Sequence, residues 1–79
     1  MDPNPTISIR LHGSLRKYRP MDADARPIAP GTTVERLAAD LGIPPGKAHL
    51  AFVDGVQSEM SAVLRGGETV GLFPPLGGG

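Results

Sequence analysis

One segment in the middle of the sequence carries a complete helix pattern, and it constrains what the surrounding residues can form. Thr32 and Glu35 have the Thr-x-x-Glu spacing of a capping box, which predicts Thr32 as the N-cap. The apolar residues that follow are spaced to share one helix face: Val34, Leu37, Ala38 and Leu41. Gly42 suits a left-handed C-cap, and the prolines at 44 and 45 prevent continuation. The pattern predicts one helix, from about residue 33 to 41, with its apolar stripe on a sheet.

Strand patterns precede this helix. Residues 6–11 alternate polar and apolar side chains, so three apolar residues would share one face of a strand: Ile7, Ile9 and Leu11. A short helical turn is expected over residues 15–18, with Ser14 as its cap. Residues 25–29 are a weak candidate for a second strand, and Pro27 restricts that strand to an edge of the sheet.

Strand patterns also follow the helix. Residues 50–53 predict a strand, and Asp54-Gly55 is typical of a type I′ hairpin turn into a short return strand from Val56. Residues 68–73 predict a final strand. Its apolar residues Val70 and Leu72 would face the helix, and Phe73 would point outward.

One helix crossing one mixed sheet is an α+β roll. We expect the first and last strands to be central and parallel, so that the C-terminal segment leaves from an interior strand. The length of 79 residues suits one small domain, predicted over residues 1–75, with a flexible glycine tail over 76–79. The absence of cysteine excludes disulfides, iron–sulfur clusters and cysteine nucleophiles.

The composition also weighs against several classes of function. Eight Lys and Arg balance eight Asp and Glu, and three aromatic residues offer few stacking platforms, so nucleic-acid binding is not expected. No apolar run has the ~20 residues of a membrane span, and the first residues lack a signal-peptide pattern, so we expect a soluble cytoplasmic protein. His12 and His49 lack the spacing of metal ligands. Arg10, Arg16 and Arg36 could meet an acidic partner, although solvated side chains are the simpler interpretation.

The sequence ends in Pro-Pro-Leu-Gly-Gly-Gly, and this ending favours presentation of a terminal carboxylate. Glycine has no side chain, so Gly77, Gly78 and Gly79 could thread a channel too narrow for other residues. Pro74-Pro75 would form a stiff extended base, because proline has a fixed φ and no amide hydrogen. A flexible linker is the alternative interpretation of these glycines.

Four segments of the sequence resemble the ubiquitin-like sulfur carriers of the MoaD/ThiS family. Residues 11–16 are similar to the family's stretch after the first strand, 31–37 to its helix start, 53–55 to its Val-Asn-Gly turn, and 64–79 to its Phe-Pro-Pro-x-x-Gly-Gly ending. The resemblance implies a β-grasp fold of four to five strands, and the two prolines favour the small subunit of molybdopterin synthase. The turn at Arg65-Gly66-Gly67-Glu68 is less acidic than is usual in the family.

The resemblance implies that a partner similar to ubiquitin-activating enzymes uses ATP to adenylate the carboxylate of Gly79. Sulfur then replaces AMP and leaves a thiocarboxylate. The chain would be a protein co-substrate rather than an enzyme, with no bound cofactor or metal. Four residues would anchor the base of the tail against the partner: Phe73, Pro74, Pro75 and Leu76. For Phe73, ordinary packing at the end of a strand is an equally good interpretation.

The resemblance does not specify which protein accepts the sulfur. The large subunit of molybdopterin synthase is the first candidate, and synthases for thiamine, cysteine, thiosugars or the tungsten cofactor are alternatives, because the partner chooses the acceptor. A ubiquitin-like protein modifier or a docking module would share the fold. Only the modifier would also need the two terminal glycines.

Overall fold

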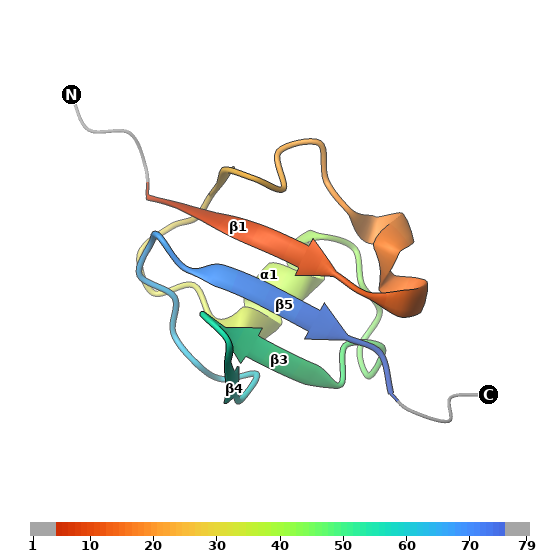
Figure 1. Ribbon diagram of the computed structural model, residues 1–79. Coiled ribbons are helices and arrows are strands. Elements are labelled where there is room, and N and C mark those ends of the chain that lie inside the picture. Colours follow the sequence, from red (N-terminus) through yellow and green to blue (C-terminus); the bar gives the residue numbers. More distant parts are fainter. Residues whose placement is uncertain (1–4, 76–79) are drawn as a thin grey trace.

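The computed structural model describes residues 5–75, which form an α+β structure around one mixed sheet of five strands (Figure 1). The strands are β1 (Thr6–Leu11), β2 (Arg26–Pro27), β3 (Leu50–Val53), β4 (Val56–Ser58) and β5 (Thr69–Phe73). Their order in the sheet is β2-β1-β5-β3-β4. The first and last strands, β1 and β5, pair in parallel, and the other neighbours are antiparallel. The prediction that β5 is an interior strand parallel to β1 is confirmed.

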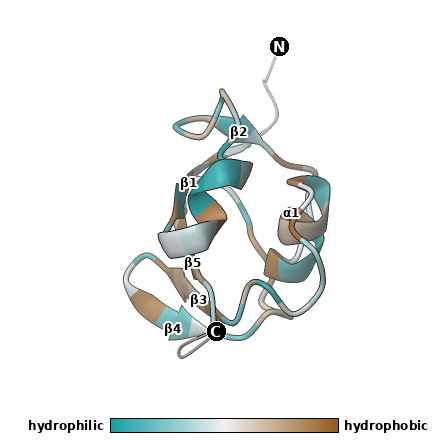
Figure 2. Cartoon of the chain, turned by 90° about the vertical axis from the view of Figure 1, so that its right-hand side faces the viewer, coloured by the Kyte–Doolittle hydropathy of each residue, from teal (hydrophilic) through white to brown (hydrophobic). Residues whose placement is uncertain are grey.

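The core lies between the sheet and α1 (Val34–Asp40), which crosses one face (Figures 1 and 2). The apolar residues predicted to share one face of the first strand are all buried, as are the two in the last strand predicted to face the helix: Ile7, Ile9, Leu11, Val70 and Leu72. From the helix, Val34, Leu37 and Ala38 are buried, and Leu41 is half-buried against them. Within the described residues, no helix covers the other face of the sheet (Figure 1). Side chains there stay accessible, and the candidate site lies among them.

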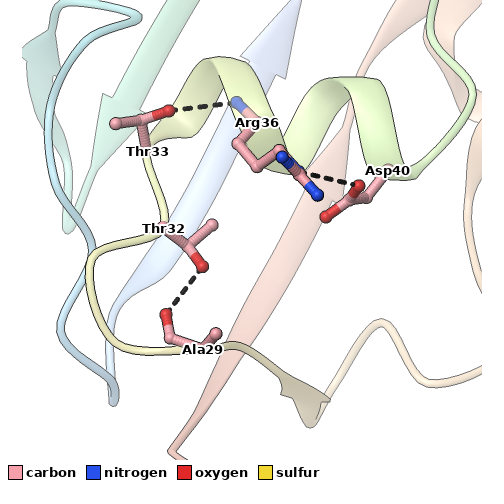
Figure 3. Close-up of polar contacts among 5 residues, drawn as sticks. All are labelled: Ala29, Thr32, Thr33, Arg36 and Asp40. Carbon is pink, nitrogen blue, oxygen red and sulfur yellow. Dashed lines mark hydrogen bonds and ion pairs between the residues drawn. The ribbon is translucent and has the colours of Figure 1, made fainter.

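The helix begins one residue later than the capping box predicts. Thr33 is the N-cap, and its hydroxyl accepts a hydrogen bond from the N–H of Arg36 at 3.1 Å (Figure 3). The Thr32 hydroxyl instead donates to the carbonyl of Ala29 at 2.6 Å, and Glu35 takes no part in a capping box. Long-range contacts select Thr33, because the segment before β5 holds this stretch of backbone. The Thr32 carbonyl accepts from Leu64, and the first two helical N–H groups donate to the carbonyls of Ala62 and Met60.

The predicted end of the helix is confirmed. Gly42 has φ of +84°, and its N–H donates to Ala39, while the N–H of Ile43 donates to Ala38. These two bonds form a Schellman motif, and Ile43 is buried beside it.

Other local predictions had mixed outcomes. Asp54 and Gly55 both have positive φ, as a type I′ turn requires, and β4 is short. The helical turn is a 3-10 helix, η1 (Gly13–Tyr18), whose N-cap is His12, so the predicted Ser14 cap is wrong. Burial of Leu15, rather than a cap, holds η1 against the sheet.

No helix within residues 5–75 combines the length and the apolar character needed to cross a bilayer.

Candidate functional site

The candidate site is the end of β5, where the chain leaves the middle of the sheet. Hydrogen bonds secure the strand at both ends. At its start, Asp54 and Thr69 exchange two bonds of 2.9 Å, one of them through the Asp54 carboxylate. At its end, the N–H of His12 donates to Leu72, and the N–H of His49 donates to Phe73 at 2.8 Å. The last residues of β5 therefore have a fixed position and direction.

Three rings form an aromatic cluster on the helix-free face at this end of β5: His12, Phe52 and Phe73. The His12 imidazole stacks flat on the Phe73 ring, with centroids 4.0 Å apart and planes 2° apart. Phe52 meets the same ring edge-to-face at 5.5 Å. The edge-to-face arrangement is a favourable one for aromatic pairs. The Phe73 side chain is therefore contacted by His12, the residue after β1, on one side and by Phe52 of β3 on the other.

Gly13 lies close to Pro74, the residue that follows β5. Its φ of +57° lies in the left-handed region, and a Cβ added there would be 3.1 Å from Pro74 Cγ. Carbon atoms pack at about 3.5–4.0 Å, so only glycine lets Pro74 come this close without adjustment. The His12–Gly13 pair thus touches two consecutive residues of the tail base, which we define as Phe73, Pro74 and Pro75.

The structure locates some of the predicted site residues. Phe73 points away from the helix, as predicted, and the whole tail base is half-buried. Its contact with a partner stays a prediction, because the ring also makes the packing contacts of an ordinary strand end. The other predicted site residues lie outside the described range: Leu76, Gly77, Gly78 and Gly79.

Two members of the aromatic cluster were missed in the sequence. The alternation of residues 6–11 already places Arg10 on the helix-free face, and His12 continues that parity. Phe52 lies directly across from Gly71 in the β3–β5 register. Parity could have placed His12 and Phe52 on this face. Their contact with Phe73 required knowing which strands are neighbours.

A shallow hollow of about 230 Å³ lies within this face, lined by the aromatic cluster together with Arg10, Gly55, Thr69 and Gly71. A larger hollow, of about 540 Å³, lies beside α1, and among residues 5–75 Glu35 is the only ionisable residue that lines it. No group of three His, Cys, Asp or Glu side chains within residues 5–75 is arranged to hold a metal ion. Neither hollow brings together an acid, a base and a nucleophile.

Glu68 organises the turn that leads into β5. Its carboxylate accepts hydrogen bonds from the N–H groups of Arg65 at 2.9 Å and Gly66 at 2.6 Å. Burial alone would raise the pKa of Glu68. Hydrogen bonds from these two backbone N–H groups and its own, with the positive charge of Arg65, outweigh burial and hold that pKa below its ordinary value of 4.5. The carboxylate therefore has a structural role at the opposite end of β5 from the tail base.

Comparison of the sequence with known protein families finds no matching family. No curated protein matches the chain at a significant level. The assignment of function therefore depends on the residues and the geometry described above.

Proposed function

We propose that this protein is a sulfur carrier with a β-grasp fold, whose Gly79 carboxylate is converted to a thiocarboxylate that donates sulfur in cofactor synthesis. One observation carries the proposal. The central strand, secured at both ends, continues directly into the sequence Phe-Pro-Pro-Leu-Gly-Gly-Gly. The parallel pairing of β1 with β5, and the single helix across one face, support the β-grasp assignment.

In the proposed chemistry, the carrier contributes only a carboxylate that the partner's active site can reach. A carboxylate is a poor electrophile, so the partner first transfers AMP to it from ATP and releases pyrophosphate. The resulting acyl-adenylate has a good leaving group. Hydrosulfide then displaces AMP, which carries away one of the carboxylate oxygens, and the thiocarboxylate remains. The partner's site supplies the groups that bind ATP and stabilise the developing charge.

The tail base suits this role because contacts from neighbouring elements hold it in place at the end of β5. Phe73 is held by two rings and by the N–H of His49. Pro74 and Pro75 follow with restricted φ angles and no amide hydrogen that could extend the sheet. A partner that docks here would meet a preorganised base, which lowers the entropic cost of ordering the segment.

The resemblance favours molybdopterin as the pathway, with the adenylating enzyme and the large subunit of molybdopterin synthase as the two partners. Synthases for thiamine, cysteine, thiosugars or the tungsten cofactor would use the same tail chemistry. Co-purification with one of these synthases from the native host identifies the acceptor.

The proposal is tested by giving the adenylating enzyme ATP, a hydrosulfide donor and one of four forms of the carrier, and by measuring the release of pyrophosphate and AMP. Wild type and Gly77→Ala should support release, because the last two glycines are intact. A form with one alanine added after Gly79 and a form lacking Gly78 and Gly79 should not support it. Equal release with all four forms would refute the proposal. If the shortened form kept the cellular role, the protein would be a docking module, and isopeptide bonds to lysines would indicate a modifier.

A further inference from the structure

We infer that the partner presents an acidic protein surface around the end of β5, and that a basic cluster recognises it: Arg10, Arg16, Lys17 and Arg19. This inference rests on the proposed function and adds the chemistry of the partner. Residues 10–19 contain four of the eight Lys and Arg and none of the eight Asp and Glu. The rest of this net-neutral chain therefore carries four basic residues against eight acidic ones. Such a separation of charge can orient an approaching partner.

The fold gathers the basic cluster beside the tail base. Arg10 lies near the end of β1, and it lines a hollow of about 170 Å³ together with His12, Arg19 and one acidic residue, Asp24. Arg16 and Lys17 lie on η1, which contacts both β1 and β5. Figure 2 views the molecule from this end, with η1 in front of the sheet. All four basic residues are exposed, and burial of Leu15 fixes the element that carries two of them.

Arg10, Arg16 and Lys17 differ from Arg26 and Arg36, each of which forms an internal ion pair. Arg26 pairs with Asp22 at 3.3 Å, and Arg36 pairs with Asp40 at 3.2 Å. Arg10, Arg16 and Lys17 have no ion pair with any residue between 5 and 75. Arg19 is 3.8 Å from Asp24, but 57% and 95% of these two side chains are exposed, so this contact is weak and easily exchanged.

An acidic protein fits this surface better than a nucleic acid does. Single-stranded nucleic acids bind to basic grooves whose aromatic rings are free to stack on bases. Here the Phe73 ring is covered by His12, and Lys17 lies over the Tyr18 ring at 5.4 Å from its centroid. Arginine pairs well with carboxylates through two parallel hydrogen bonds. A rim of Asp and Glu around the partner's channel would therefore match the exposed guanidinium groups.

The test compares two charge reversals of equal size in the full chain, Arg16→Glu and Arg36→Glu. Association with the adenylating enzyme is followed by stopped flow at several salt concentrations. Arg16→Glu should slow association about tenfold at low salt, and the difference should shrink as salt screens the charges. The association rate of Arg36→Glu should stay within about twofold of the wild-type rate, because Arg36 lies on α1 and is not part of the cluster.

The rate of thiocarboxylate formation at saturating enzyme should be the same for Arg36→Glu and wild type, because Arg36 lies on α1, outside the basic cluster. Equal association rates for Arg16→Glu and wild type would overturn the inference, and so would an equal loss of association rate in Arg16→Glu and Arg36→Glu. Salt-dependent competition by a single-stranded oligonucleotide at the same residues would also overturn it. If wild type forms thiocarboxylate while Arg16→Glu associates normally, the sulfur-carrier proposal is supported and the inference about the acidic partner fails. If wild type forms none, both proposals fail.

Discussion

Replacement of Gly13 by alanine tests whether the His12–Gly13 pair positions the tail base. The backbone at Gly13 has φ of +57°, where a residue with a Cβ costs about 1–2 kcal/mol. The new Cβ would also lie 3.1 Å from Pro74 Cγ, which is about half an ångström closer than carbon atoms normally pack. Gly13→Ala should therefore both destabilise the fold and displace Pro74.

Gly31→Ala is the matched control for this experiment. Gly31 has φ of +86°, and a Cβ there would meet nothing within 4 Å, so the control carries the backbone cost without the contact. Urea denaturation should show a loss of about 1–2 kcal/mol in both variants. Only Gly13→Ala should shift the NMR resonances of Pro74 and of the stacked Phe73 and His12 rings. Unchanged resonances in Gly13→Ala, or equal shifts in Gly31→Ala, would refute the positioning role.

Two further predictions concern the scaffold. Thr33→Ala should lower the free energy of unfolding by about 1 kcal/mol, because the N-cap bond to Arg36 is lost, and an unchanged urea midpoint would contradict Thr33 as the cap. Glu68→Gln should destabilise the protein at neutral pH. The lowered pKa of Glu68 makes its carboxylate stabilising above the ordinary value of 4.5, and this contribution is lost as the pH falls through the lower folded-state pKa. Urea unfolding at a series of pH values should show the two proteins converging in acid, and a difference that does not depend on pH would contradict this assignment.

The elements that depend on local patterns were predictable from the sequence. The alternation in residues 6–11 and the glycine after Leu41 specify a strand and a helix end through contacts within a few residues. The Asp54-Gly55 turn is equally local, since it depends on two residues that tolerate positive φ.

Features that depend on distant segments were not predictable in the same way. Two adjacent threonines can both cap the helix, and hydrogen bonds with residues 60–64 decide between Thr32 and Thr33. The stack of His12 on Phe73 depends on the parallel register of β1 and β5. The approach of Gly13 to Pro74 likewise joins residues far apart in the sequence. The candidate site was therefore predictable as a segment of sequence, whereas its supporting contacts were not.

The central claim is that Gly79 carries the sulfur, and top-down mass spectrometry tests it most directly. The full chain is incubated with the adenylating enzyme, ATP and a sulfide donor, and its intact mass is then measured and its fragments sequenced. The account predicts a gain of about 16 Da, one oxygen exchanged for one sulfur, confined to fragments that contain Gly79. An unchanged mass, or a gain located on any other residue, would contradict it.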